Sequence, residues 1–200
     1  MPVTISGDGI VTGIAVGGLP NGIIDESTLA NNAVTPSKST ITPGITHCDQ
    51  WRLTANIIGD KDPITGDLER VDDASFTKIG SAGMTESSGT WSFPVSGIWK
   101  VEWNIALRYN GSSRWNDIRT FFSSNNGGAW DEVVRAVHGL ARVDSTNTYT
   151  SAHSQCIVDV TDVAQCKVKF GIDTEEGGEQ VSTHSGINFT YWTFTRLGDT

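Results

Sequence analysis

A strict alternation of apolar and polar residues runs through the centre of the chain, from Trp99 to Tyr109. One set of alternate positions is large and apolar: Trp99, Val101, Trp103, Ile105, Leu107 and Tyr109. The intervening positions are Lys100, Glu102, Asn104, Ala106 and Arg108. Because successive side chains leave a strand on opposite sides, this period of two predicts a long β-strand with one buried face. The rest of the fold is expected to pack against that face.

A corner precedes this strand, since Pro94 and Gly97 interrupt the pattern. Proline cannot donate to a sheet ladder and glycine permits a turn. We therefore expect a short strand that ends at Phe93, followed by a bend.

Further strand patterns lie on both sides, separated by glycine-rich or charged segments. The predicted strands are 47–58, 75–79, 115–123, 133–143, 155–160, 166–172 and 187–196, and the predicted loops and turns are 59–73, 80–88, 110–113, 125–128, 145–150 and 175–179. Within 166–172, Cys166, Val168, Phe170 and Ile172 face one way, and Lys167 and Lys169 the other. Roughly eight to ten short strands at this spacing predict an all-β antiparallel sandwich, and a jelly roll is the expected topology.

Residues 1–44 differ from the rest, because they contain no aromatic residue and no cysteine but many glycines and small β-branched residues. Such a segment cannot bury enough apolar surface to fold alone. We expect an extended arm (1–44) that is ordered against another chain, with a short helix at 26–31. The head (45–200) is expected to follow the Pro43-Gly44 pair.

The formal net charge of −9 and the absence of any Lys/Arg cluster argue against a nucleic-acid partner and against an anionic membrane surface. No apolar run approaches the ~20 residues of a membrane span. The first residues, Met-Pro-Val-Thr-Ile-Ser-Gly-Asp, lack the basic and apolar regions of a secretory signal. If the protein works outside a cell, we expect it to leave by lysis or within a particle.

Three cysteines, Cys48, Cys156 and Cys166, are too few and odd in number for a disulfide framework. We expect buried free thiols that pack as small apolar groups. A disulfide between two of them is the alternative.

No catalytic motif is evident. The four histidines, His47, His138, His153 and His184, lie in separate segments, so zinc-ligand spacing is absent. Neither a Gly-x-Ser-x-Gly elbow nor a phosphate-binding loop occurs, and we expect no enzyme activity. The segment Asp60-Lys61-Asp62-Pro63-Ile64-Thr65-Gly66-Asp67-Leu68-Glu69 departs from a calcium loop at Ile64 and Gly66. No cofactor is expected, with calcium at this loop or at Glu175, Glu176 and Glu179 as the alternative to solvated acidic loops.

Two tryptophans stand apart from the expected core residues Trp51, Trp99, Trp103 and Trp192. Trp115 follows a Gly/Ser turn, and Trp130 follows Gly127-Gly128. Aromatic residues near loop tips anchor surface ligands, above all sugars, or they close the end of a sheet. Both interpretations stay open for Trp115 and Trp130.

The run Leu-Ala-Asn-Asn-Ala-Val-Thr-Pro-Ser-Lys, from Leu29 to Lys38, resembles N-terminal segments of structural proteins of marine tailed bacteriophages. The Gly-Ile-Val-Thr-Gly-Ile run before it adds to this resemblance, which covers about a fifth of the chain. It implies a virion location and an arm that docks on other virion proteins, with Leu29, Ala33 and Val34 as the docking segment.

A second resemblance covers 45–200. The motif Gly-Thr-Trp-Ser-Phe-Pro-Val-Ser-Gly-Ile-Trp (89–99) and the ending Ser-Gly-Ile-Asn-Phe-Thr-Tyr-Trp-Thr-Phe-Thr-Arg-Leu-Gly (185–198) resemble the C1q/TNF-like family. Many members have Tyr where Trp99 stands, so one position departs. The resemblance implies a jelly roll and a homotrimer, and some members of the family bind calcium.

These observations predict a phage virion structural protein: a trimeric fibre or appendage whose head faces outward and binds a glycan or protein of the host surface. The first alternative is a capsid decoration protein, either a head fibre or a cement trimer. A bacterial adhesin or an assembly scaffold is the second.

Overall fold

The computed structural model describes residues 4–5, 11–12, 44–73, 76, 78–184 and 186–200. The chain divides into two compact units, Met1–Pro43 and Gly44–Thr200. In the first, β1 (Thr4–Ile5) pairs antiparallel with β2 (Val11–Thr12). The helix expected at 26–31 lies outside the described residues. We call Gly44–Thr200 the head.

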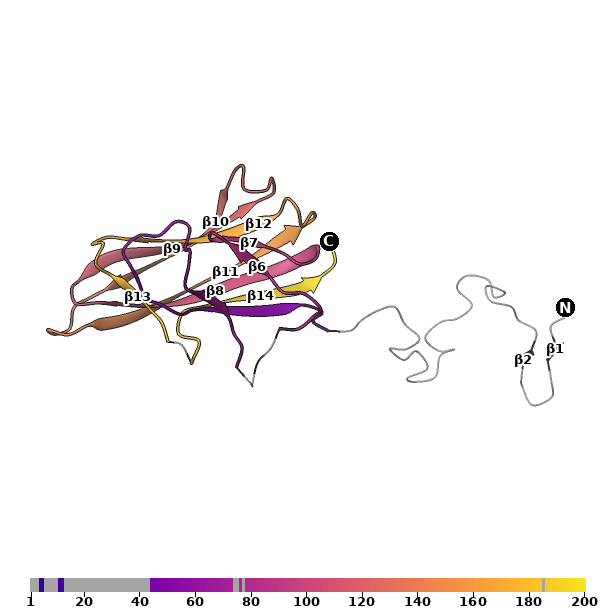
Figure 1. Ribbon diagram of the computed structural model, residues 1–200, viewed down its shortest axis with the longest axis horizontal. Coiled ribbons are helices and arrows are strands. Elements are labelled where there is room, and N and C mark those ends of the chain that lie inside the picture. Colours follow the sequence, from indigo (N-terminus) through magenta and orange to yellow (C-terminus); the bar gives the residue numbers. More distant parts are fainter. Residues whose placement is uncertain (1–3, 6–10, 13–43, 74–75, 77, 185) are drawn as a thin grey trace. The chain divides into compact units, whose positions relative to one another are not determined.

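The head is a sandwich of two antiparallel sheets (Figure 1). The five-stranded sheet has the order β10 (Asp131–Leu140), β9 (Ser113–Ser123), β12 (Lys167–Thr174), β7 (Thr90–Ser92) and β6 (Thr85–Ser87). The seven-stranded sheet contains β11 (Thr148–Val160), β8 (Gly97–Tyr109), β14 (Tyr191–Gly198), β13 (Gln180–Ser182), β3 (Cys48–Leu53), β4 (Ile57–Ile58) and β5 (Leu68–Arg70). β11 pairs with one edge of β8, while β14 and β13 pair with successive parts of its other edge. The predicted all-β sandwich is confirmed.

The central strand β8 has the predicted faces. Trp99, Val101, Trp103, Ile105 and Leu107 are each at most 1% exposed, and Tyr109 is half-buried. The ring of Trp103 stacks on that of Trp192 from β14, with 5.6 Å between centroids and 9° between planes. Its indole Nε1 donates to Thr120 Oγ1 of the opposite sheet at 3.2 Å. β8 therefore organises the core, as the alternation predicts.

The corner before β8 is also confirmed. β7 ends at Ser92, and the indole Nε1 of Trp99 donates to the carbonyl oxygen of Val95 at 3.2 Å. Gly97 has φ +139°, and a Cβ at this position would lie 2.4 Å from the carbonyl oxygen of Gly198. Only glycine fits where this corner meets the end of β14.

The predicted first strand, 47–58, is wrong in extent, because the chain leaves β3 after Leu53 and pairs elsewhere as β4. The amide and hydroxyl of Thr54 both donate to the carbonyl oxygen of Asp67, at 2.7 and 2.9 Å. Asn56 Oδ1 accepts from the amide of Thr183 at 3.0 Å. These contacts bend the chain from β14 towards β13.

Two short strands lie where loops are predicted, β5 in 59–73 and β6 in 80–88. A third, β13, directly follows the predicted loop 175–179, in a segment for which no element is predicted. β11 begins at Thr148, so the predicted loop at 145–150 is too long and the predicted strand at 155–160 too short. The inward positions at the start of β11 are Thr150, Ala152 and Ser154, whose small or polar side chains hide the alternation. The predicted strand 75–79 lies partly outside the described residues, and Ile79 forms an isolated bridge with Cys48.

The three cysteines are free thiols: Cys166 is buried, while Cys48 and Cys156 are half-buried. Burial raises the pKa of the Cys156 thiol to about 11, so it is protonated and unreactive at neutral pH. The disulfide alternative is therefore wrong for this structure.

Candidate functional site

The outward face of the five-stranded sheet brings Trp115 and Trp130 onto one surface. Outward positions of β9 are Trp115, Asp117, Arg119 and Phe121, because the alternate positions pair with core residues of β12. Trp130 directly precedes β10, after the turn that follows β9. Trp115 lies at the other end of β9, six residues or about 20 Å from Phe121. One small ligand therefore cannot touch both tryptophans.

Trp130 stands in a small cluster with Lys169, Phe121 and Asp62. The ammonium of Lys169 lies 4.6 Å from the centre of the Phe121 ring and 5.3 Å from that of Trp130. It also pairs with Asp62 Oδ1 at 2.7 Å. Cation–π contacts of this kind hold an aromatic ring in a fixed orientation. The half-buried Trp130 ring is thus held from one side before any ligand arrives.

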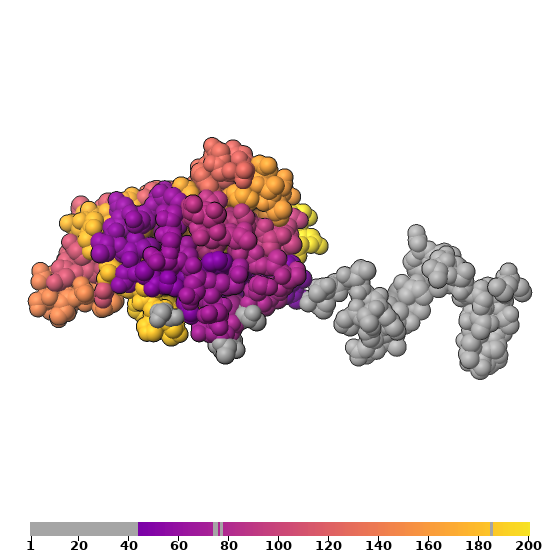
Figure 2. Space-filling model, in the orientation of Figure 1, coloured from indigo at the N-terminus to yellow at the C-terminus, as the bar shows by residue number. Residues whose placement is uncertain are grey.

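The turn beneath Trp130 is ordered by its own hydrogen bonds. Asn125 Oδ1 accepts from the amide of Ala129 at 2.8 Å, and Ser123 Oγ accepts from the amide of Gly127 at 2.9 Å. A Cβ at Gly127, where φ is +84°, would lie 3.4 Å from the Trp130 ring. The turn also touches the one after β11, since the amide of Asn126 donates to the carbonyl oxygen of Gln165 at 2.8 Å. In Figure 2 these two turns, in salmon and orange, form a lobe at the top of the head.

Paired charges fill the surface between the two tryptophans. Arg119 pairs with Asp173 at 2.8 Å, and Arg135 pairs with Asp117 at 3.0 Å and with Glu132 at 2.6 Å. The hydrogen bond from Arg135 lowers the pKa of Glu132, and the same contact raises the pKa of Arg135. This face therefore carries charged hydrogen-bonding groups, held in place by ion pairs, between Trp115 and Trp130.

Trp115 lies near the start of β9, just after the predicted Gly/Ser turn. It is half-buried, and its carbonyl oxygen accepts from Ser113 Oγ at 3.0 Å. Its neighbour Arg114 pairs with Glu175, whose pKa is lowered chiefly by a hydrogen bond from the Arg114 amide. Trp115 and Trp130 are thus both half-buried beside a turn, and Trp130 has in addition the Lys169 contact that orients its ring.

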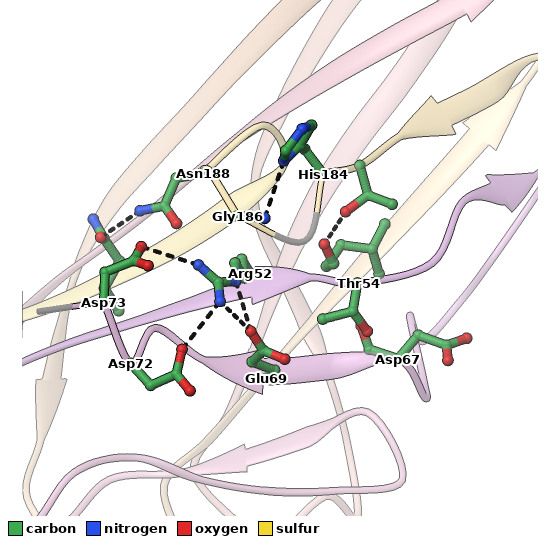
Figure 3. Close-up of polar contacts among 12 residues, drawn as sticks. Arg52, Thr54, Asp67, Glu69, Asp72, Asp73, His184, Gly186 and Asn188 are labelled. Atoms are coloured by element: carbon green, nitrogen blue, oxygen red, sulfur yellow. Dashed lines mark hydrogen bonds and ion pairs between the residues drawn. The ribbon is translucent and has the colours of Figure 1, made fainter.

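A second polar centre lies on the seven-stranded sheet, around Arg52 of β3 (Figure 3). The guanidinium is 4% exposed and contacts three carboxylates: Glu69 through Nε at 2.7 Å, Asp72 at 3.1 Å and Asp73 at 3.1 Å. Burial disfavours its charge, but the bond to Glu69 and the charges of the three carboxylates prevail and raise the pKa of Arg52. Three carboxylates thus contact one guanidinium, and these contacts hold β5 and the segment after it against β3.

In the two acidic segments considered as calcium sites, 60–69 and 175–179, the carboxylates point to different partners. Asp60 Oδ1 accepts from the amide and hydroxyl of Thr174, both at 2.8 Å, whereas Glu69 faces Arg52. Glu179 is fully buried, with Oε1 accepting from the amide of Glu176 at 3.2 Å. Among the residues that the structure describes, no three His, Cys, Asp or Glu side chains are arranged to hold a metal ion. The expectation of no cofactor and the calcium alternative both stay untested, and a melting curve with and without added calcium would distinguish them.

The outward face of β11 carries the other exposed apolar groups of interest. Tyr149 is 56% and Ile157 66% exposed, and on its outer edge β11 pairs with no strand of the described head. Ile157 borders a hollow with Lys100 and Gln155. A long unpaired edge with exposed apolar residues is a common site of association. The residues predicted to form the docking segment, Leu29, Ala33 and Val34, lie outside the described residues.

Sequence comparison found no matching family model and no similar curated protein. Structure comparison found two informative similarities. Murine APRIL, crystallised at pH 5.0, is 11% identical and superposes with a TM-score of 0.53 over 76% of this chain and 98% of its own. Eiger TNF from S. frugiperda is 8% identical, with a TM-score of 0.56 over 78% of this chain and 96% of its own. The head has a TNF-like jelly-roll fold.

At these identities the similarity concerns the fold alone, and fold does not determine function. It confirms the jelly-roll fold that the resemblance of 89–99 and 185–198 to the C1q/TNF-like family implies. In the part of the chain that the structure describes, no helix is long and apolar enough to cross a membrane.

The sequence missed the partners of Trp130. Lys169 was expected on the outward face of its strand, and that position is confirmed by its pairing with Phe121. An outward lysine opposite an outward aromatic residue is the signal that could have indicated the cluster. Asp62, 107 residues away along the chain, gave no such signal.

Proposed function

We propose that this protein is a structural component of a tailed-phage particle: a trimeric appendage attached through residues 1–44, with an outward head that binds the host cell surface. The observation that carries the proposal is the joining of a TNF-like head to a separate N-terminal unit that contains the phage-like run Leu29–Lys38. A jelly roll provides a rigid platform, and its sheet faces and loops are free to carry contacts.

Binding through several copies suits such a head. Three weak sites on each trimer, and many trimers on a particle, raise the apparent affinity by roughly 10²–10⁴ over one site where the geometry allows it. The face bearing Trp130 supplies the contact in this proposal, and a host-surface sugar is its ligand class. The ring offers a flat apolar surface, and Arg119, Asp173 and Arg135 offer hydrogen bonds beside it.

Immunogold electron microscopy of particles from the producing lysate tests the proposal. Label on the tail is the expected result. Label scattered over the capsid would instead identify a decoration protein, whose contacts through residues 1–44 matter most. The absence of labelled particles would contradict any virion role and favour an adhesin or an assembly scaffold.

The trimer gives a separate prediction. At micromolar concentration, the full chain should have the mass of a trimer by analytical ultracentrifugation. We place the exposed edge strand β11 in the contact, so Ile157→Asp should yield a folded monomer because it brings an unpaired charge into a closed interface. Val133→Asp, on β10 of the other sheet, is the matched control and should stay trimeric. A monomeric wild type would contradict the proposed assembly.

Removal of the Trp130 ring should weaken attachment. We expect Trp130→Ala to reduce binding of labelled full-length protein to host cells by roughly tenfold or more, the usual cost of losing a central aromatic contact. Val137→Ala, a 60% exposed position of β10, should bind normally. Trp115→Ala should have the smaller effect, because Trp115 lies within the strand. Equal binding by the Trp130→Ala and Val137→Ala variants would exclude Trp130 from the contact.

A further inference from the structure

One side of the sandwich is closed by two edge strands from different sheets. β10 is the edge of the five-stranded sheet, β11 is the edge of the seven-stranded sheet, and the two are in contact. Within the described head, each pairs with a strand on one side alone. Side-chain packing rather than a hydrogen-bonded ladder therefore joins β10 to β11. We call this contact the seam.

His138 lies on the inward face of β10, one of the two strands of the seam, and is half-buried. It pairs with Asn116 of β9, which is fully buried, and both lie on the face that carries core residues. Nδ1 and Nε2 of His138 are both shielded from solvent without a hydrogen-bond partner, and so is Asn116 Oδ1. The Asn116 amide Nδ2 is directed to Ser113 Oγ at 3.0 Å and to the carbonyl oxygen of His138 at 3.4 Å.

The surroundings offer little compensation for a positive charge on this ring. On β9 the neighbouring carboxylate is Asp117, which faces outward and is paired with Arg135 of β10. The inward residues of β11 are Thr150, Ala152, Ser154, Cys156, Val158 and Val160, and none is charged, because the Cys156 thiol stays protonated. The His153 and Asp159 side chains of this strand face outward. The other charged groups of β10, Asp131 and Glu132, lie at its far end. An imidazolium at His138 would therefore be buried without a direct partner, which is strongly unfavourable.

We propose that the seam is an acid-operated latch, which is closed at neutral pH and opens when His138 takes up a proton. Opening separates β10 from β11, lets water reach the ring, and frees two strand edges at once. The device belongs to the head and does not depend on the proposed virion role.

The direction of the pH effect follows from linkage. Burial lowers the pKa of His138 from its usual 6.5, and the charge of Asp117 opposes this only in part. The open state keeps the usual value, so it binds the proton more tightly than the closed state does. The closed seam is thus fully stable above pH 6.5 and loses stability as the pH falls below that value. Between about pH 7.5 and about pH 5.5, the opening equilibrium should rise by up to roughly tenfold.

Hydrogen exchange of the full-length protein at these two pH values tests the latch. After correction for intrinsic rates, amides of 131–140 and 148–160 should exchange up to roughly tenfold faster at the lower pH in the wild type. His138→Gln and His138→Phe carry no titrating group and should lose this acceleration. His153→Gln is the matched control on the outward face of β11, and it should keep the full response.

The location of the response separates the latch from other titrations. The pKa of His47 is also lowered, by burial and then by Arg196 and Lys78, but its effect should appear in β3 and β14. A wild type with equal corrected exchange in the seam at both pH values would overturn the proposal. So would a His138→Gln variant that keeps the full acceleration. If neither His138 variant folds, the wild type still tests the proposal. The pH midpoint of the exchange acceleration in the seam must then coincide with the midpoint at which the His138 ring-proton NMR signals titrate, and different midpoints would overturn the latch.

Discussion

Trp103→Asp should leave the head unable to fold. The Trp103 side chain is 1% exposed, stacks on Trp192 and lies 5.4 Å from Phe170 between ring centres. Loss of the ring alone costs about 3–5 kcal/mol in a core, and a buried carboxylate adds several more. Because a domain of this kind is stable by about 5–15 kcal/mol, the sum removes most or all of its stability.

The measurement is a circular dichroism melt of the soluble fraction, with Val143→Asp as the control. Val143 is also apolar but is 83% exposed in the loop between β10 and β11, so that variant should melt cooperatively near the wild-type temperature. A soluble, cooperatively melting Trp103→Asp protein would show that the faces of β8 are assigned wrongly.

Asp49→Ala should have the second largest effect. Asp49 is 2% exposed and points into the sandwich from β3. Its Oδ2 accepts from the indole of Trp51 at 3.0 Å and from the amide of Met84 at 2.8 Å, and Arg70 donates to Oδ1 at 3.0 Å. Removal of the carboxylate leaves all three donors without this partner. We expect a loss of about 3–5 kcal/mol in the free energy of unfolding, the usual cost of breaking a buried ion pair.

Urea unfolding at equal protein concentrations, followed by tryptophan fluorescence, measures this loss. Asp72→Ala is the matched control, because Asp72 also pairs with an arginine but is 79% exposed and shares Arg52 with two other carboxylates. It should change the free energy of unfolding by less than about 1 kcal/mol. Similar midpoints for the two variants would mean that burial of Asp49 contributes little.

Local signals in the sequence were sufficient where the alternation is strict, as in β8 and β12, but not for the long strand β11. The alternation from Trp99 to Leu107 predicted both faces of β8, and that of Val168, Phe170 and Ile172 predicted the core face of β12. Asn126 and Gly127 have positive φ angles in the turn that was predicted at 125–128 from its Asn and Gly residues. The C1q/TNF-like resemblance of two motifs predicted the sandwich that joins these strands.

The short strands gave no such signal. β5, β6 and β13 are three residues each, too few to show a period, and they are strands because a neighbouring edge offers them hydrogen bonds. Asp49 looks like a surface residue from its type. It is buried because Arg70 and Met84, brought next to it by the fold, satisfy its oxygens.

The sequence by itself thus determined the fold class, the central strand and the core positions of Trp99, Trp103 and Trp192, because a period of two and large apolar side chains act locally along one strand. It did not single out Trp91, which is 1% exposed. The tertiary structure alone decided which strands pair, which charged side chains form ion pairs and which polar atoms are buried from solvent. Lys169 meets Trp130 and Asp62, and the ring nitrogens of His138 are shielded from solvent, through contacts between segments far apart in the chain. Such contacts depend on packing and desolvation in three dimensions, which no local pattern encodes.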